Sequence, residues 1–268
     1  MSHRIAAFRR SKDLRLVCLI LFAYRACKGR TLVVAANRDE FHDRPAREAH
    51  WWDSESSIFG GRDLKAGGAW LAMRRDGRFA AVTNWSENPN APAPASRGDL
   101  ATGFLSGNEP ARDYIEAIDG ELYNGFNLIA FDGEEMVYSS NRTGEVRSLP
   151  PGVYGLTNTR LGDRWPKAVH GARALSQAAP HATTVDLIAL LAKPHLPVER
   201  EYDGDLQPER SFSPCFIVGD HYGTRASTAV IVTEERVEFA EQHYGPHGVA
   251  GARIEESFDI VWHAQPRA

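Results

Sequence analysis

The hydrophobic residues near the start of the chain fall in short uninterrupted runs. Residues 16–24 form one such run, which the turn sequence Lys28-Gly29-Arg30 separates from a second run at residues 31–36. Short runs rich in aliphatic and aromatic side chains, with a glycine turn between them, predict a β-hairpin. A strand that is apolar on both faces is buried between two other layers of structure. The hairpin therefore predicts a fold of several layers.

Similar hydrophobic segments recur along the chain, and most come in pairs. Further hairpins are predicted where residues 70–73 pair with 79–85 across an Asp-Gly turn, and where residues 127–131 pair with 136–140. Additional strands are predicted at residues 152–158, 216–219, 226–233 and 237–242. Helices are predicted at residues 99–107, 110–119, 163–178 and 183–193, and irregular structure at 37–52 and 86–98. Strand pairs separated by helical blocks, without βαβ alternation, favour two stacked antiparallel sheets flanked by helices over a parallel doubly wound sheet.

The N-terminal segment has the charge pattern of a signal peptide. Residues 1–16 carry five basic residues and precede an apolar run of nine. A run of that length is too short to span a bilayer, which requires about 20 residues. Arg25 also lies where a cleavage site needs small residues, so a buried strand is the favoured interpretation. We expect residues 1–16 to be an untranslated or disordered extension and residues 17–268 to form one cytoplasmic domain, because no shift in composition marks a second one.

Composition and charge narrow the class of partner. The net charge is −4, from 31 Lys and Arg against 35 Asp and Glu, so no overall field would attract nucleic acid or an anionic membrane. Three cysteines at unrelated spacings argue against a disulfide framework, and the ten histidines form no zinc-binding pattern. A small-molecule substrate is the expected partner, with no cofactor or metal, and the sequence does not predict the oligomeric state.

Three polar features could carry chemistry, and each also has a structural interpretation. Cys18 lies in the first apolar run, where a cysteine is most often a small buried hydrophobe. The polar residues 37–40 follow the second run directly and would ordinarily form a solvated turn. Asn84 and Asn158 each follow a threonine at the end of a predicted strand, where an amide can simply satisfy a turn. Taken singly, each feature favours the structural interpretation.

The same features combine into one mechanism if Cys18 is the first residue of the mature chain. Its free α-amine could then act as the base for its own thiol, as in proteins with an N-terminal threonine nucleophile, and no histidine is required. Amides at strand ends, such as those of Asn84 and Asn158, would donate hydrogen bonds to the developing oxyanion. Asp39 could orient the ammonium group of Cys18. An arginine, either Arg38 or Arg225, could lower the pKa of the thiol or bind a substrate carboxylate.

Several sequence strings carry a family resemblance over nearly the whole chain. They are Cys18-Leu19-Ile20, Ala35-Ala36-Asn37-Arg38-Asp39-Glu40-Phe41, Arg44-Pro45, Gly67-Gly68-Ala69-Trp70-Leu71, Ala81-Val82-Thr83-Asn84, Gly155-Leu156-Thr157-Asn158 and Tyr222-Gly223-Thr224-Arg225-Ala226-Ser227-Thr228. Together they resemble the NRDE family, the transport and Golgi organisation homologues. That family resembles the N-terminal-nucleophile hydrolases of the choloylglycine hydrolase, penicillin V acylase and acyltransferase type. The resemblance implies an α+β fold, a four-layer αββα sandwich.

The resemblance also implies a set of catalytic residues. In the order nucleophile, amine-contacting aspartate and two oxyanion asparagines, these are Cys18, Asp39, Asn84 and Asn158. Acylases of this type place an arginine three residues before the aspartate, where this chain has Ala36. Arg38 and Arg225 are therefore both candidates for the arginine of the site.

Members of the resembled family usually begin Met-Cys, whereas here sixteen residues and Val17 precede Cys18. A GUG codon that serves as the start codon is written as valine in a deduced sequence when the reading frame is assumed to begin further upstream. Our hypothesis is that Val17 is the initiator methionine, whose removal exposes Cys18.

Two functions from different classes follow from the resemblance. The first is a cysteine hydrolase or acyltransferase that acts on a non-peptide amide through a thioester at Cys18. The second is a non-catalytic carrier of haem, lipid or acyl-CoA, since eukaryotic members of the resembled family are linked to Golgi organisation and to haem or lipid handling. Haem would be a ligand only in this second case.

Overall fold

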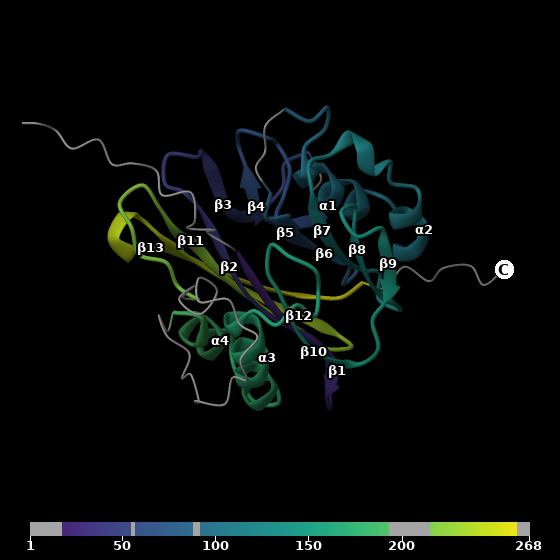
Figure 1. Cartoon of the computed structure of the whole chain (residues 1–268). Helices are drawn as coiled ribbons and strands as arrows, with labels where there is room; N and C mark the ends of the chain where they lie inside the picture. Colours follow the sequence, from purple (N-terminus) through teal and green to yellow (C-terminus); the bar gives the residue numbers. More distant parts are fainter. Residues whose placement is uncertain (1–17, 55–56, 88–91, 193–214, 262–268) are drawn as a thin grey trace, which may run out of the picture.

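The computed structural model describes residues 18–54, 57–87, 92–192 and 215–261, so the expected extension at 1–16 lies outside the described residues. Within these ranges the strands form two antiparallel sheets that stack face to face (Figure 1). The six-stranded sheet has the order β10 (Gly152–Leu156), β1 (Leu19–Cys27), β2 (Arg30–Phe41), β11 (Tyr222–Val232), β12 (Arg236–Tyr244) and β13 (Ala250–Asp259). The seven-stranded sheet has the order β3 (Ala46–Trp51), β4 (Ile58–Asp63), β5 (Leu71–Arg74), β6 (Phe79–Asn84), β7 (Phe126–Phe131), β8 (Met136–Ser140) and β9 (Glu145–Ser148).

Helices cover the outer face of each sheet (Figure 1). The helices α1 (Arg97–Ser106) and α2 (Ala111–Glu116) pack on the seven-stranded sheet, and α3 (Pro166–Ala178) and α4 (Thr184–Leu191) pack on the six-stranded sheet. Short 3₁₀ turns lie at Gly120–Leu122 and Pro246–Gly248. The expected α+β class, with two stacked antiparallel sheets flanked by helices, is confirmed.

The packing of β1 explains its uninterrupted apolar run. Ile20 and Phe22 belong to the hydrophobic cluster between the two sheets, whereas Leu19 and Leu21 belong to the cluster beneath α3 and α4. Because both faces of the strand are buried from Leu19 to Tyr24, every position in that part is apolar. The strand pairs with β2 on one side and β10 on the other, so it is an interior strand of the sheet.

The predicted strand at residues 216–219 is wrong. Those residues form no strand, and Val218 is 60% exposed. The Ile217 N–H donates to the hydroxyl of Thr224 at 2.9 Å, and the Ile217 carbonyl accepts from the Thr224 N–H at 2.9 Å. The segment therefore folds back on the start of β11, and its backbone groups are used there instead of in a sheet ladder.

The prediction of irregular structure over residues 37–52 is also wrong. The strand β2 continues through its polar residues to Phe41 because it pairs with β11 along its whole length, and β3 follows at Ala46–Trp51. Three further strands, β4, β9 and β13, were not predicted. In β13 most residues are exposed, so the strand has no apolar run.

A close backbone contact joins the loop before β5 to the start of α1. A Cβ atom on Gly68 would overlap the backbone carbonyl group of Gly98, so glycine is required for the two segments to meet. The helix itself begins with a capping box. The hydroxyl of Ser96 accepts from the Gly98 N–H, and the carboxylate of Asp99 accepts from the Ser96 N–H.

Candidate functional site

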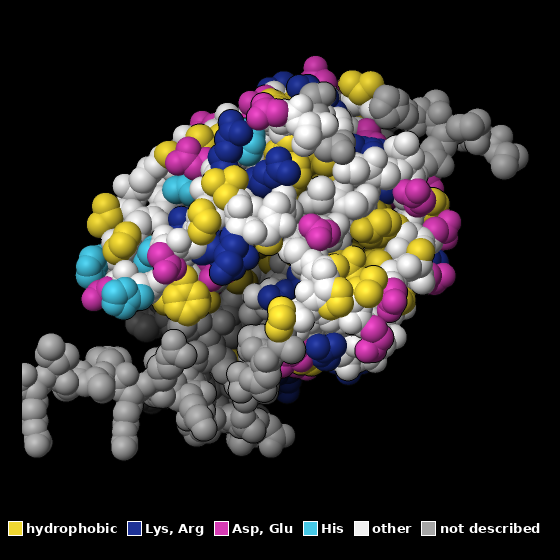
Figure 2. All heavy atoms as spheres, turned by 90° about the horizontal axis from the view of Figure 1, so that it is seen from above, with side chains coloured by type: hydrophobic (Ala, Val, Ile, Leu, Met, Phe, Trp, Pro, Cys, Tyr) yellow, Lys and Arg dark blue, Asp and Glu magenta, His cyan; other side chains and the backbone are white. Residues whose placement is uncertain are grey.

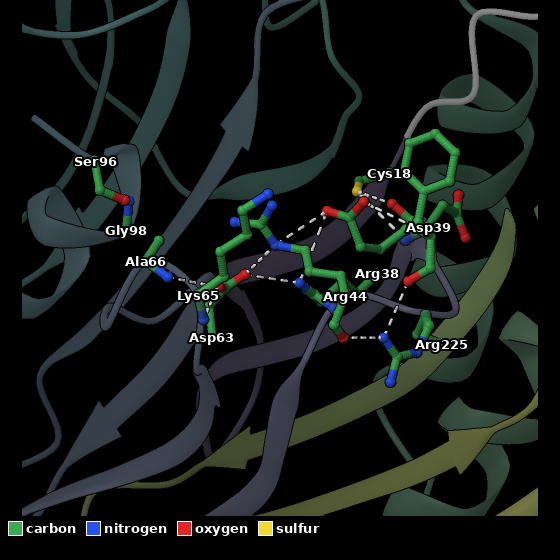
Figure 3. A network of polar contacts seen from close by, with 12 residues as sticks. Cys18, Arg38, Asp39, Arg44, Asp63, Lys65, Ala66, Ser96, Gly98 and Arg225 are labelled. Carbon is green, nitrogen blue, oxygen red and sulfur yellow. Dashed lines mark hydrogen bonds and ion pairs between the residues drawn. The ribbon is translucent and has the colours of Figure 1, made fainter. Parts of the chain in front are cut away.

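Cys18 stands at the start of β1, beside the polar end of β2. The antiparallel register pairs Leu19 with Asn37, which places the preceding Cys18 opposite Arg38 and within reach of the Asp39 backbone. The thiol of Cys18 donates to the Asp39 carbonyl at 3.6 Å, and the Asp39 N–H donates to the sulfur at 3.4 Å (Figure 3). The apolar hairpin therefore fixes the cysteine against the backbone of the aspartate that the sequence singled out.

The side chain of Asp39 is fully buried and is held from two other elements. Its Oδ1 accepts from the hydroxyl of Thr224 on β11 at 2.6 Å, and its Oδ2 lies 3.9 Å from Nζ of Lys167 on α3. The hydroxyl of Tyr222 donates to the Asp39 carbonyl at 2.9 Å. Strand β11 and helix α3 thus set the position of the carboxylate next to Cys18.

Burial dominates the ionisation of both groups. Burial raises the pKa of the Asp39 carboxyl from 3.8 to about 6, against the opposing effects of the Lys167 charge and the Thr224 hydrogen bond. Burial, followed by the charge of Asp39, raises the pKa of the Cys18 thiol from 9.0 to about 12, although Arg38 and Lys167 oppose the rise. In the 268-residue chain, the thiol is therefore protonated at neutral pH.

A cavity of about 560 Å³ opens beside Cys18. Its walls are the polar end of β2, the loop between β4 and β5, the end of β6 and the segment that leads into α1. The volume falls in the range of roughly 300–1,000 Å³ that is usual for small-molecule sites.

The two asparagines end neighbouring strands of different sheets. Asn84 ends β6, is exposed and lines the cavity together with Cys18. Asn158 follows β10, and its carbonyl accepts from the Ser86 N–H at 2.6 Å, so the two strand ends meet. The Asn158 side chain is not among the groups that line the cavity. Its Oδ1 is buried and accepts no hydrogen bond from the described residues.

Two arginines and two carboxylates form a compact ionic cluster in the cavity wall (Figure 3). The Oδ2 of Asp63 lies 3.1 Å from the guanidinium of Arg38 and 2.5 Å from that of Arg44. The carboxylate of Glu40 lies 3.8 Å from Arg38 and 3.7 Å from Arg44. The charges of this cluster compensate one another.

Of the two candidate arginines, Arg38 lines the cavity beside Cys18 and Arg225 does not. The guanidinium of Arg225 donates to the carbonyls of Phe41 at 3.1 Å and Arg44 at 2.6 Å. It therefore holds the turn that follows β2 (Figure 3).

Comparison with known proteins shows to which family this chain belongs. A family model described as "Transport and Golgi organisation 2" matches residues 17–246. The chain belongs to this family. It is 33% identical over 258 residues to the "Transport and Golgi organization protein 2 homolog" of Bos taurus, a match that covers 84% of this chain and 92% of that protein. The human protein of the same name is 31% identical over 256 residues, again with 84% and 92% covered, and the Drosophila melanogaster "Transport and Golgi organization protein 2" is 25% identical over 260 residues, with 82% and 89% covered.

Two further properties of this Transport and Golgi organisation 2 family member bear on its site. Within the described residues no group of three or more His, Cys, Asp or Glu side chains is arranged to hold a metal ion. No helix in the same part of the chain is long and apolar enough to cross a membrane.

Sequence reasoning did not assign three residues that surround Asp39. Tyr222 and Thr224 were part of a recognised string but had no role, and their contacts with β2 now supply one. Lys167 lies inside a predicted helix and had no assigned role. The one available signal was its place between Pro166 and Ala168 in a mainly apolar stretch, which is unusual for a lysine.

Proposed function

We propose that this family member is a cysteine hydrolase or acyltransferase that cleaves a non-peptide amide through a thioester at Cys18. The observation that carries the proposal is the position of Cys18 directly before the interior strand β1, against buried Asp39 and beside a cavity of small-molecule size. The order of helix, sheet, sheet and helix supports the resemblance to N-terminal-nucleophile hydrolases.

In the proposed reaction the α-amine of Cys18 takes the thiol proton, and the sulfur attacks the amide carbon. The carbonyl electron pair moves to oxygen, where the side-chain amide of Asn84, which lines the cavity, donates a hydrogen bond to it. The side chain of Asn158 would have to turn into the cavity to donate a second one. The C–N bond then breaks, the amine leaves with the proton from the α-ammonium, and a thioester remains on Cys18. Water or an acceptor amine attacks the thioester, which releases the acid or a new amide and returns a proton to the sulfur.

The charged residues have supporting roles in this scheme. We assign Asp39 to orient the α-ammonium of Cys18, because its carboxylate is buried beside that residue. We assign Arg38 as the arginine of the site, because it lines the same cavity and its charge lowers the pKa of the Cys18 thiol. Arg225 supports the turn after β2 instead.

The mechanism requires Cys18 to be N-terminal. A preceding residue turns the α-amine into an amide, which accepts no proton, and the thiol then keeps its raised pKa of about 12. The family match begins at residue 17, immediately before Cys18, which supports the proposal that Val17 is the initiator.

The raised pKa of Cys18 in the 268-residue chain favours a second candidate for that form. With the thiol protonated, the cavity would bind a ligand without reacting. The ligand would then be haem, a lipid or an acyl-CoA, and binding would not depend on the sulfur.

The test compares a chain that begins Met-Cys18 with the 268-residue chain, each with its N-terminus established by mass. We expect Cys18 of the shorter chain to react faster with iodoacetamide at neutral pH, with the labelled cysteine located by mass, and the shorter chain to turn over acylated amides. The variant Cys18→Ala should abolish turnover and leave only the labelling of the other two cysteines. Equal rates for the unprocessed full-length chain would contradict the free-amine mechanism. Stoichiometric binding of haem or acyl-CoA that survives Cys18→Ala, without turnover, would favour the carrier.

A further inference from the structure

Positive charge is in excess in the cavity lining once the side chains that form ion pairs are set aside. The lining contains four cationic side chains, Arg38, Arg44, Lys65 and Arg97, and three carboxylates, Asp39, Glu40 and Asp63. Arg38 and Arg44 are neutralised by Glu40 and Asp63. The charge of Asp39 is balanced by that of Lys167 on α3, which does not line the cavity. Arg97 and Lys65 are left, and neither has an ion pair with any residue that the structure describes.

Arg97 is the more telling of these two cations because it is largely desolvated. Its guanidinium donates only to the carbonyl of Gly125, at 3.3 Å, among the described residues. The neighbouring carboxylate of Glu87 binds Arg142 at 2.7 and 2.8 Å and the Gly125 N–H at 2.8 Å. Burial lowers the pKa of Arg97, the nearby charge of Glu87 opposes this shift, and the charge of Arg44 adds to it. Because Glu87 gives its oxygens to Arg142 and Gly125, Arg97 has lost water without gaining a hydrogen bond to a carboxylate, and a ligand anion could supply one.

The position of this charge relative to Cys18 is also informative. In Figure 3, Lys65 and Asp63 are drawn between Cys18 and Asp39 on one side and Ser96 and Gly98 on the other. Arg97 lies between the last two in sequence and lines the same cavity as Cys18. A ligand in the cavity could therefore meet the sulfur and the guanidinium with different parts of its structure.

We propose that the cavity accepts an acyl amide that carries a carboxylate, with Arg97 binding the carboxylate and Lys65 assisting at the more exposed edge. The proposal rests on the proposed function for the site where the amide reacts, and names the class of substrate. One desolvated cation balances one negative charge, which favours a carboxylate over a doubly charged phosphate. The planar guanidinium of Arg97 matches the two oxygens of a carboxylate.

The charge preference belongs to the cavity and not to the surface as a whole. Figure 2 shows Lys and Arg side chains intermixed with Asp, Glu and hydrophobic side chains on the face seen there. The net charge of the whole chain is −4. A general attraction for anions is therefore not expected.

Two matched probes test the proposal on the 268-residue chain with Cys18→Ala, in which catalysis is absent. The probes are N-hexanoylglycine and its neutral amide, N-hexanoylglycinamide, and calorimetry measures their dissociation constants. We expect the acid to bind about tenfold more tightly than the amide. The variant Arg97→Gln should abolish the preference, and Lys65→Gln should reduce it by a smaller factor. The control Arg236→Gln removes an exposed charge at the opposite end of β11 and should leave the preference unchanged.

Equal affinity for acid and amide, no binding of either probe at millimolar concentration, or an equal loss with Arg236→Gln would overturn the assignment. Thermal unfolding of each variant shows whether it is folded. If Arg97→Gln does not fold, Lys65→Gln still tests the charge preference, because Lys65 is exposed and its replacement should not disturb the fold. The measurement needs no turnover, so the two proposals fail separately. A chain that cleaves amides but binds both probes equally refutes the carboxylate site alone, whereas a chain that prefers the acid but never reacts refutes the reaction alone.

Discussion

At the scale of single residues, the most unusual feature is the ion pair behind Cys18. The side chains of Lys167 and Asp39 are 1% and 0% exposed. A buried pair seldom adds net stability, because the loss of water from two charges offsets their attraction. Breaking the pair by removing one partner is nevertheless strongly destabilising, since it strands the other charge. Lys167 therefore acts on the site through Asp39, as a positioning residue.

The variant Lys167→Met should lose stability in a pH-dependent way. The folded-state pKa of Asp39, about 6, lies above its unfolded value near 3.8, so this carboxyl favours the folded state most at low pH and the benefit is lost as pH rises through about 6. Without Lys167 this pKa rises further. Denaturant unfolding should show a loss of about 3–5 kcal/mol near pH 8 and much less near pH 4.

The control for this prediction is the same substitution in an Asp39→Asn background. There the loss should no longer change with pH, because no carboxyl is left to titrate. A penalty of equal size at both pH values in the single variant would show that Lys167 acts by packing and not through the charge of Asp39.

At the scale of secondary-structure elements, the start of α1 has two tasks. Its capping box ends the segment that walls the cavity, and its first residue is Arg97. The placement of the guanidinium thus depends on where the helix begins. Loss of the cap would therefore loosen both the first turn of α1 and the position of the Arg97 side chain.

Replacing Ser96 by Ala should destabilise the protein by about 1 kcal/mol, because it removes the acceptor for the Gly98 N–H. Denaturant unfolding measures the change. Ser176→Ala is the matched control, since Ser176 is exposed within α3 and should change stability by at most about 0.5 kcal/mol. Similar losses for the two variants would mean that the box does not stabilise α1.

The elements also show what the sequence could predict. The buried hairpin of β1 and β2 followed directly from its apolar runs. The continuation of β2 to Asp39 did not, because its polar residues indicated irregular structure, and Asp39 was linked to Cys18 only through the proposed mechanism and the family resemblance. Strand β13 was not predicted because most of its residues are exposed and its first four residues show no apolar alternation. The role of Lys167 was not predicted for another reason. Lys167 contacts Asp39, which lies 128 residues earlier in the sequence, and no local pattern reports such a contact.

At the scale of the whole molecule, the described residues from Leu19 onward form both sheets and the helices that cover them. Three hydrophobic clusters, one between the sheets and one beneath each pair of helices, consist of residues that follow Cys18. Ordering residues 1–16 would cost about 1–2 kcal/mol per residue in backbone entropy. Five of its residues are basic, and burying such side chains without partners would add to this cost.

A chain that begins Met-Cys18 should therefore unfold at the same temperature as the 268-residue chain. Calorimetric scans of both proteins at equal concentration measure this. A lower melting temperature for the shorter chain would show that the segment contributes to the fold, and would argue against its being an untranslated leader.

The contact between Gly68 and Gly98 has a consequence for how ligands are selected. Two backbones that touch without side chains between them leave little compliance, so the far wall of the cavity is fixed to the loop before β5. The span from the sulfur of Cys18 to that wall is then set before any ligand arrives. A compound shorter than this span can contact the sulfur or the far wall, but it cannot contact both at once.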